Sequence, residues 1–235
     1  MKLALFGRGG MGAVLAERAR AAGHEIGATL TSADAANNGD QLAALLRGHD
    51  AAIDFSTADA VLAHATACAR ARVPLVEGTT GWRDRERSVL AAVEADGGAL
   101  VYGANFSIGA NLFFRLATRA AELFRGFPEY DPFIEEAHHA AKRDAPSGTA
   151  LRLRDILGGA SGRVIPVAST RAGHIPGTHR VGFDSPADQV TLEHTARSRD
   201  GFAAGALLAA AWIVKRRGVF TFDEVVDDML ATVRR

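Results

Sequence analysis

Two imidazoles and an ammonium group gather in one segment of the sequence, residues 135–150. His138 and His139 are adjacent, and Lys142 follows shortly after them. Imidazole changes protonation near neutral pH and an ammonium group can donate a proton, so these side chains could supply the proton that must accompany a hydride transfer. The segment therefore predicts acid–base chemistry of the kind that a reductase needs.

A turn in the same segment predicts a binding site for a carboxylate. Ser147, Gly148 and Thr149 precede a helical pattern, so hydroxyls and free backbone N–H groups would meet at a helix N-terminus. Each residue also has an ordinary interpretation: the serine as a helix cap, the histidines as structural residues and Lys142 as a solvated cation. Their combination in one segment favours a functional site.

Zinc binding is the other interpretation of adjacent histidines. On a strand, His138 and His139 would point to opposite faces, and too few nearby cysteine or carboxylate ligands have suitable spacing. We therefore expect no metal site.

A glycine-rich loop near residue 10 predicts a dinucleotide site. The residues Gly7, Arg8, Gly9, Gly10, Met11 and Gly12 fit the pattern G-x-G-x-x-G and lie between an apolar run and a helical pattern. Glycine lets the backbone turn tightly and approach a pyrophosphate, which is then bound by N–H groups of the helix N-terminus. A turn that binds nothing is the alternative, but the strand–loop–helix context favours the nucleotide.

The end of the second predicted strand bears on the choice of cofactor. NAD-binding folds place an acidic residue about 20 positions after the glycine loop, where it binds the ribose 2′-hydroxyl. Here Thr31 and Ser32 occupy that region, and the nearest carboxylate, Asp34, lies beyond it. Hydroxyls tolerate a 2′-phosphate and Arg8 could pair with one, so the sequence favours NADPH and leaves NADH open.

Short apolar runs alternate with helical patterns through about residue 102, as in parallel βα units. The expected strands are 2–6, 25–30, 51–55, 75–77 and 99–102, and the expected helices are 11–22, 41–47, 59–71 and 84–95. This rhythm predicts an α/β fold with a Rossmann-like dinucleotide-binding domain.

The rhythm changes after residue 105, where a second architecture begins. We expect helices at 111–124 and 149–157, strands at 133–138, 163–169, 179–183 and 189–196, and closing helices at 202–216 and 222–233. The pattern predicts a strand-rich second lobe.

Composition excludes several classes of partner. Lysine plus arginine and aspartate plus glutamate number 27 each, so no global field favours nucleic acid or an anionic membrane. The longest apolar stretch, 202–214, is shorter than the roughly 20 residues that cross a bilayer, and the first apolar run is too short for a signal peptide. The single Cys68 fits a reducing compartment. We expect a cytoplasmic protein without nucleic-acid or membrane partners.

The segment E-A-H-H-x-x-K-x-D-A-P-S-G-T-A, residues 136–150, resembles the signature of the dihydrodipicolinate reductases. Further motifs follow the family's order: Asp54-Phe55-Ser56, Gly78-Thr79-Thr80-Gly81, Ala104-Asn105-Phe106-Ser107, Arg171-Ala172-Gly173 and Gly177-Thr178-His179. The resemblance extends over nearly the whole chain.

The resemblance implies NAD(P)H-dependent reduction of 4-hydroxy-tetrahydrodipicolinate to tetrahydrodipicolinate, in the diaminopimelate route of lysine biosynthesis. It implies that His138 gives or takes a proton and that Lys142 donates one. The dicarboxylate substrate would be bound by His139, Gly148 and Thr149. The implied cofactor-binding set is Gly7, Arg8, Gly9, Gly10, Met11, Gly12, Gly78, Thr79, Thr80, Gly103, Ala104, Asn105 and Phe106.

The resemblance also implies the domain plan and the assembly. A dinucleotide-binding domain of residues 1–106 would be completed by C-terminal helices in 203–235. Residues 107–202 would form an α+β domain on a mixed sheet, which builds a homotetramer. Arg171 and His179 stay outside the catalytic set, because they could either close the substrate lobe or merely pair with carboxylates on its sheet.

Two other functions stay open. One is a two-lobe dehydrogenase for another amino or imino acid, such as aspartate or diaminopimelate, and the His-His-Lys segment argues against it. The other is a catalytically silent nucleotide sensor, since fold does not decide function. His138 and Lys142 argue against that alternative.

Overall fold

The chain forms two compact units in a computed structural model that describes residues 1–31 and 39–233. Unit 1 comprises Met1–Ile108 and Arg199–Arg235, and unit 2 comprises Gly109–Ser198. Unit 2 is thus inserted into the sequence of unit 1. Ser32 and Asp34, which bear on the prediction of the cofactor, lie outside the described residues.

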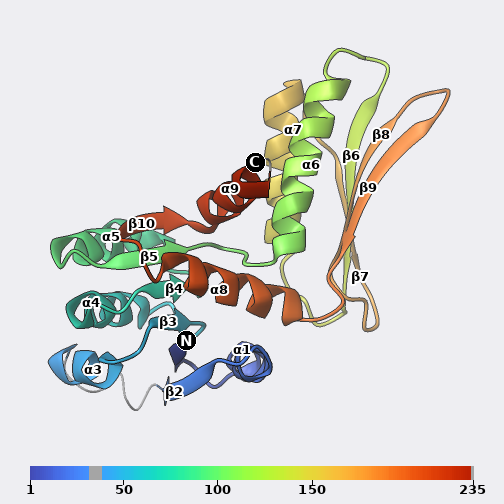
Figure 1. Ribbon diagram of the computed structural model, residues 1–235. Coiled ribbons are helices and arrows are strands. Elements are labelled where there is room, and N and C mark those ends of the chain that lie inside the picture. Colours follow the sequence, from blue (N-terminus) through green and yellow to red (C-terminus); the bar gives the residue numbers. More distant parts are fainter. Residues whose placement is uncertain (32–38, 234–235) are drawn as a thin grey trace. The chain divides into compact units, whose positions relative to one another are not determined.

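Unit 1 is built on a six-stranded parallel sheet in the order β10-β5-β4-β3-β1-β2 (Figure 1). Its strands are β1 (Lys2–Phe6), β2 (Glu25–Leu30), β3 (Ala51–Asp54), β4 (Leu75–Glu77), β5 (Ala99–Tyr102) and β10 (Gly218–Thr221). Strand β1 pairs with both β2 and β3, so the strand order changes direction there. Ligands of open α/β sheets bind at such a switch point, and the predicted Rossmann-like fold is confirmed.

Helices cover both faces of this sheet. One core contains α1 (Gly10–Ala21), α8 (Asp200–Ile213) and α9 (Phe222–Val233). The other contains α3 (Gly39–Leu46), α4 (Val61–Ala71) and α5 (Glu86–Ala95), which follows the 3₁₀ turn η1 (Arg83–Arg85). Leu3 and Leu5 enter the first core and Ala4 and Phe6 the second, because successive side chains of a strand point to opposite faces. Burial on both faces explains why the four inner strands, β1, β3, β4 and β5, are mainly apolar.

The sequence prediction is wrong in one element of unit 1. Residues 218–221 form β10, whereas the sequence pattern predicts only helices after residue 202. The strand has four residues and pairs in parallel with Ala99–Tyr102 of β5. So short a run has no periodicity of its own, and the edge of the sheet makes it a strand. Helix α8 correspondingly ends at Ile213, before the predicted end.

Unit 2 contains a mixed four-stranded sheet in the order β7-β6-β8-β9 (Figure 1). Its elements are α6 (Ile108–Phe124), β6 (Asp131–His138), α7 (Gly148–Ser161), β7 (Val167–Arg171), β8 (Thr178–Asp184) and β9 (Gln189–Thr195). Strand β6 runs parallel to β7 and antiparallel to β8. The predicted strand at 163–169 begins only at Val167, because Pro166 has no N–H group for the ladder.

Helices α6 and α7 cover one face of the unit 2 sheet, and the other face is open (Figure 1). Along β6, Ile134, Glu136 and His138 are buried on the covered face. The open face is polar: Arg180 on β8 lies 3.0 Å from both Glu135 Oε2 and Glu193 Oε2. Two ionisable side chains on a covered face are unusual, and they direct attention to the end of β6.

Within the described residues, no helix combines the length and the apolar character that crossing a membrane requires.

Candidate active site

The loop between β1 and α1 has the geometry that a pyrophosphate needs. Gly7 adopts a φ of 96°, and a Cβ at Gly12 would lie 2.3 Å from the Gly7 carbonyl oxygen, so both positions demand glycine. Gly9 caps α1 without a side-chain hydrogen bond, and the first turn holds no acidic residue. The N–H groups at this helix start are therefore left for an anion, as the binding of a dinucleotide requires.

The other predicted cofactor segments lie at the same edge of the sheet. Gly78, Thr79 and Thr80 follow β4, and the stretch 103–106 follows β5, so both sit at carboxyl ends of parallel strands, as does the glycine loop. The structure thus brings the three segments of unit 1 to one edge. Phe106 is 1% exposed and its ring packs 4.5 Å from that of Phe222, so only its backbone is available to a ligand.

In the glycine loop, Arg8, Gly9 and Gly10 are exposed and Met11 is half-buried. Arg8 forms no ion pair with a carboxylate among the described residues, which leaves its guanidinium group available for a phosphate. Ala104 is exposed, while Asn105 Oδ1 accepts a hydrogen bond from the Ser107 backbone N–H (2.8 Å) and shapes this turn.

In unit 2, His138 belongs to a buried charged group that pairs across two strands. His138 Nδ1 lies 2.5 Å from Glu136 Oε2, and Arg171 Nη2 lies 2.7 Å from Glu136 Oε1. Glu136 and His138 share a face because they are two residues apart on β6, and Arg171 is opposite His138 on β7. The strand register therefore assembles the group.

Opposing effects decide the protonation of this pair. Burial alone would raise the pKa of Glu136, but hydrogen bonds from Arg171 and Ser169 and the charge of His138 lower it to about 2. Burial lowers the pKa of His138, and the attraction of Glu136 only partly offsets this. At neutral pH, Glu136 is thus ionised and His138 is neutral, with its proton on Nδ1 and a lone pair on Nε2.

Gly177 allows the His138 ring to sit where it does. A Cβ at Gly177 would lie 3.0 Å from His138 Nε2, a tighter contact than side chains normally make. The backbone also ties the segment in place, since the Ala172 N–H donates to the His138 carbonyl (3.1 Å) and the Ala140 N–H to that of Gly173 (3.1 Å). The ring is therefore held by packing as well as by its contact with Glu136.

His179, which the sequence left outside the catalytic set, packs against His138. Its ring lies edge-on to His138 with centroids 5.1 Å apart, and its Nε2 lies 2.9 Å from Ser147 Oγ. Burial, followed by the charge of His138, lowers the pKa of His179 to about 4, so the imidazole is neutral at pH 7 and shares a hydrogen bond with the serine. Ser147 Oγ also accepts from the Ala150 N–H (3.3 Å), which confirms it as the cap of α7.

The remaining predicted residues of unit 2 lie on the loop after β6 and at the start of α7. Lys142 Nζ donates to both oxygens of Asp144, at 2.8 and 3.0 Å, and this lowers the pKa of the aspartate. His139 and Gly148 are exposed and Thr149 is half-buried. These groups are accessible to a ligand, whereas the hydroxyl of Ser147 already makes hydrogen bonds with the Ala150 N–H and with His179.

The structure also bears on the role of Arg171 and on the expectation that the chain binds no metal. Arg171 pairs with a carboxylate on its own sheet, as one of the two sequence interpretations held. Ligand atoms of Glu136, His138 and His179 lie within 4.8 Å of one another, a spacing that could hold a metal ion. The guanidinium of Arg171 already neutralises Glu136 and would repel a cation there, so the donor set favours our expectation of no metal.

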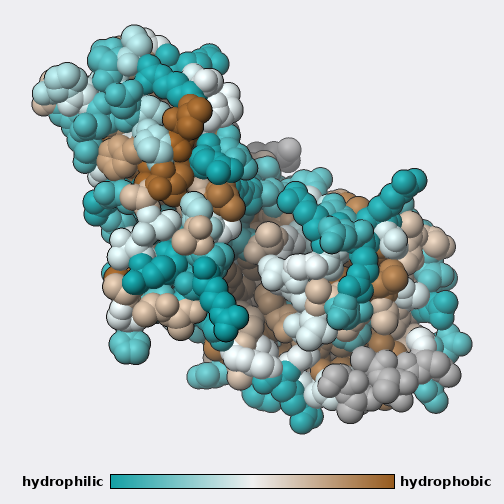
Figure 2. Space-filling view, turned by 180° about the vertical axis from the view of Figure 1, so that it is seen from behind, coloured by the Kyte–Doolittle hydropathy of each residue, from teal (hydrophilic) through white to brown (hydrophobic). Residues whose placement is uncertain are grey.

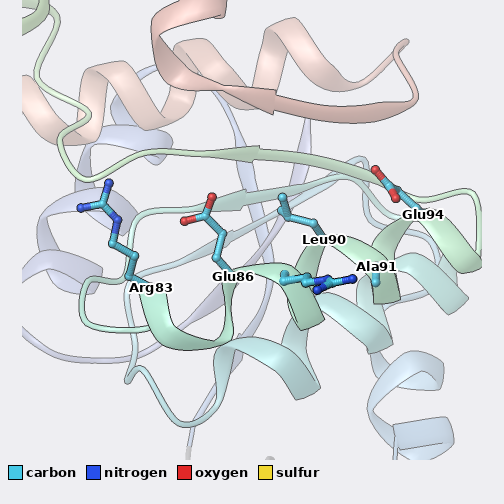
Figure 3. A pocket seen from close by; sticks show the side chains of 6 residues that line it. Arg83, Glu86, Leu90, Ala91 and Glu94 are labelled. Carbon is cyan, nitrogen blue, oxygen red and sulfur yellow. The ribbon is translucent and has the colours of Figure 1, made fainter.

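A shallow surface pocket lies along η1 and α5, where Figure 3 shows its side chains. It is lined by Arg83, Glu86, Arg87, Leu90, Ala91 and Glu94. No residue of the predicted cofactor or substrate sets lines it, so it is separate from the sites described above.

Comparisons with known proteins agree along almost the entire chain. Residues 1–106 match the family described as "Dihydrodipicolinate reductase, N-terminus", and residues 109–226 match "Dihydrodipicolinate reductase, C-terminus". A 4-hydroxy-tetrahydrodipicolinate reductase of Christiangramia forsetii is 35% identical over 241 residues, which cover 97% of this chain and 99% of that protein. Another, of Laribacter hongkongensis, is 39% identical over 204 residues, covering 78% and 75%.

A solved structure has the same fold. The dipicolinate-bound dihydrodipicolinate reductase of Paenisporosarcina sp. TG-14 superposes with a TM-score of 0.79 at 22% identity, and the match covers 94% of this chain and 97% of that one.

Proposed function

The chain belongs to the dihydrodipicolinate reductase family, which reduces 4-hydroxy-tetrahydrodipicolinate in diaminopimelate and lysine biosynthesis, and on this premise we propose how its residues share the work. The family resemblance inferred from the sequence is confirmed, and the reductase prevails over the alternative dehydrogenase and the silent sensor. The enzyme uses NAD(P)H, and the reduced nicotinamide supplies the hydride. The protein must hold the reactants and deliver a proton.

We propose that His138 and Lys142 carry the proton chemistry. The supporting observation is the contact of His138 Nδ1 with ionised Glu136, which leaves Nε2 as the free, reactive nitrogen. Neutral His138 accepts a proton in the free enzyme. A bound dicarboxylate adds negative charge nearby and raises the pKa of His138, which converts it into a donor. Lys142, already an ammonium group within reach of Asp144, is the second donor.

The substrate carboxylates, in this proposal, are held by His139, Gly148 and Thr149. Two of these residues begin α7, where unpaired N–H groups favour an anion, and their exposure supports access. Arg171 is an unsuitable substrate ligand because its guanidinium is already engaged by Glu136. It instead supports the ionised state of that carboxylate.

For the cofactor, we propose that the glycine loop 7–12 holds the pyrophosphate and that the segments 78–80 and 103–106 hold the nicotinamide end. The close approach that Gly7 and Gly12 allow supports the first assignment. Arg8 is exposed and could pair with the 2′-phosphate of NADPH. We therefore propose NADPH as the preferred cofactor, with NADH as a second substrate.

The assay that tests this function follows the absorbance of NADPH, and separately of NADH, after purified enzyme meets freshly generated 4-hydroxy-tetrahydrodipicolinate. We expect oxidation of both, with a lower KM for NADPH because Arg8 adds a charge-assisted contact. Aspartate and diaminopimelate with the oxidised cofactors serve as controls and should give no turnover. Folded protein that oxidised neither cofactor with intact substrate would contradict the proposed function, and equal KM values would remove the preference.

We also propose that four chains assemble through unit 2. Its sheet has an open polar face, and α6 and the loop after it expose Leu112, Leu116, Leu123 and Phe127. Apolar side chains are visible on the surface of unit 2 in Figure 2, and such patches favour contacts between subunits. Light scattering should give a mass four times the 24.7 kDa of one chain. The mass of a single chain at micromolar concentration would refute the tetramer.

We place this enzyme in the cytoplasm, with small molecules rather than nucleic acid or membrane as its partners. Its balanced charge and its single, buried Cys68 support both parts of this proposal.

A further inference from the structure

Three ionisable side chains are buried together beneath one of the proposed cofactor segments. Asp54 ends β3, Glu77 ends the neighbouring β4, and His64 lies on α4; they are 0%, 0% and 3% exposed. Asp54 and Glu77 are direct partners in the ladder, so their side chains share a face of the sheet. Two acidic groups this close, in a dry environment, cannot both be ionised without a large energetic cost.

Asp54 is the member that several donors stabilise as an anion. His64 Nδ1 lies 2.6 Å from Asp54 Oδ2, and the His64 ring is stacked on Phe6 with centroids 4.0 Å apart. The Ser56 N–H donates to Asp54 Oδ1 (2.8 Å), and Thr79 Oγ1 donates to the same oxygen (3.4 Å). Donors from three different segments thus converge on this one carboxylate.

Glu77 has the contacts of a neutral carboxylic acid. Its Oε1 accepts a hydrogen bond from the Thr79 N–H (2.7 Å), while no donor among the described residues reaches Oε2. Asp54 faces Glu77 across the ladder, and Thr79 contacts both carboxyl groups, so the two acids share one buried site. Two carboxyl groups can bond to each other only when one of them carries a proton. Burial, and then the charge of Asp54, raise the pKa of Glu77 well above its ordinary value.

Thr79 is held by this cluster from several sides. Its N–H binds Glu77, its hydroxyl binds Asp54, and its carbonyl accepts from Trp82 Nε1 (2.8 Å). The Gly78 N–H donates to the Asp54 carbonyl (2.9 Å). The conformation of the segment 78–80 therefore depends on the hydrogen bonds that Glu77 and Asp54 make.

We propose that Glu77 is a positioning residue for the cofactor: as a neutral acid that shares its proton with Asp54, it holds the loop 78–80 in the shape that binds the nicotinamide nucleotide. This inference rests on the proposed assignment of that loop to the cofactor. Ionisation of Glu77 would break its bond to Asp54 and place a second negative charge beside the first. The loop would then shift, and the anionic cofactor would bind less tightly.

The other titratable groups around the pair do not replace Glu77 in this role. Cys68 on α4 lies near both acids, and burial, followed by their charges, raises the pKa of its thiol well above the ordinary value. Tyr102, opposite Glu77 on β5, donates its hydroxyl to Glu86 Oε1 (3.3 Å) on α5. On α4, the imidazole of His64 contacts Asp54 through Nδ1. The proton between the two carboxyl groups is therefore the one that titrates with an effect on the loop.

Infrared spectroscopy of the full-length enzyme tests the protonation directly. At neutral pH the wild type should show the carbonyl stretch of a protonated carboxylic acid, and the substitution Glu77→Gln should remove that band. Glu94→Gln, which changes an exposed carboxylate on α5, is the matched control and should leave the band in place. A wild-type spectrum without a protonated acid, or a band that survives Glu77→Gln, overturns the inference.

The pH dependence of NADPH binding tests the positioning role. As pH rises through the pKa of Glu77, the dissociation constant of the wild type and of Glu94→Gln should rise, by up to about tenfold per pH unit above that pKa. The Glu77→Gln amide offers a donor to Asp54 and an acceptor to Thr79 without ionising, so its dissociation constant should lack that rise. Parallel profiles of the wild type and Glu77→Gln overturn the inference.

One further variant separates this inference from the proposed function beneath it. Thr80 is exposed in the loop, and Thr80→Trp should block the cofactor and weaken NADPH binding at every pH, by about tenfold or more. Wild-type affinity in Thr80→Trp would show that the cofactor binds elsewhere, so the assignment of the loop would fail. Reduced affinity in Thr80→Trp together with parallel pH profiles would leave the loop assignment intact and reject Glu77.

Discussion

Substitution of His138 by glutamine is expected to lower the turnover number by about 100-fold or more, the scale of lost acid–base catalysis. Glutamine can still contact Glu136, but its amide cannot take up and release a proton near neutral pH as an imidazole does. The cofactor set lies in unit 1, so the dissociation constant for NADPH should stay at the wild-type value. Steady-state absorbance assays give the turnover number, and fluorescence titration gives the dissociation constant for NADPH.

His174→Gln is the matched control for this experiment. His174 is an exposed histidine of the same unit, and it lies outside the group formed by Glu136, His138 and Arg171. Its substitution should leave turnover within about twofold, as expected for a surface position away from the chemistry. Wild-type turnover in His138→Gln would remove His138 from the mechanism.

Substitution of Glu136 by glutamine should impair both catalysis and folding. The carboxylate orients His138 through Nδ1, so its loss should lower turnover by about 10- to 100-fold, comparable to the loss of an orienting partner. Glu136 also raises the pKa of His138, so the variant should need a lower pH to protonate the imidazole. Because His138 must be protonated to act as a donor in the substrate complex, the alkaline limb of the turnover–pH profile should shift to lower pH, which a purely structural role would not produce.

Stability should fall in the same variant because Arg171 would lose its anionic partner. Breaking a buried ion pair costs about 3 to 5 kcal/mol, and the 16% exposure of the Arg171 side chain places the expected loss at about 3 kcal/mol. Chemical denaturation at neutral pH measures this loss. Glu135→Gln is the matched control: the neighbouring carboxylate lies on the open face in an exposed pair with Arg180, whose loss should cost at most about 1 kcal/mol.

Acidification should narrow the gap in stability between the wild type and Glu136→Gln. The pKa of Glu136 is lowered in the folded protein, from 4.5 to about 2, so its ionised form stabilises the fold above the ordinary pKa. That contribution is lost as pH falls through this window, and the glutamine variant has none to lose. The melting temperatures of the wild type and Glu136→Gln should therefore lie closer together at pH 3 than at pH 7. A difference of the same size at both pH values would show that the charge of Glu136 does not stabilise the fold.

Most of unit 1 could be predicted from the sequence because its four inner strands are buried on both faces. The runs 2–6, 25–30, 75–77 and 99–102 are mainly apolar, and each coincides with an observed strand. The short strand β10 could not be predicted in this way. Its four residues carry no period, and only their pairing with β5, more than a hundred residues earlier in the chain, makes them a strand.

The site was predictable to the extent that its residues are neighbours in sequence. His138 and Lys142 fall within one segment, and the local motif identifies them. The neighbours that affect the pKa of His138 could not be predicted in this way. Arg171 and His179 lie beside β6 because of two different strand pairings. One local signal was present, because Glu136 lies two residues before His138 and must share its face of a strand.

The cluster of Asp54, Glu77 and His64 is the clearest case of information that the sequence does not display. Two strand ends and one helix contribute to it, and the spacing of these residues along the chain does not indicate that they lie close together. An acidic residue at the end of an apolar run reads as the point where a strand becomes exposed. Here the sheet buries both acids, and α4 covers them.

The split sequence of unit 1 has a consequence for the order of events on the ribosome. Residues 1–108 emerge first, yet their sheet lacks its edge strand β10 and its covering helices α8 and α9 until residue 233 has been made. At about 5 to 20 residues per second, the nascent chain spends on the order of ten seconds with one face of that sheet covered by α1 alone. Unit 2 is continuous and can close during this interval. The half of the enzyme that is translated first is therefore the last to mature, and it is the half that a nascent-chain chaperone would protect.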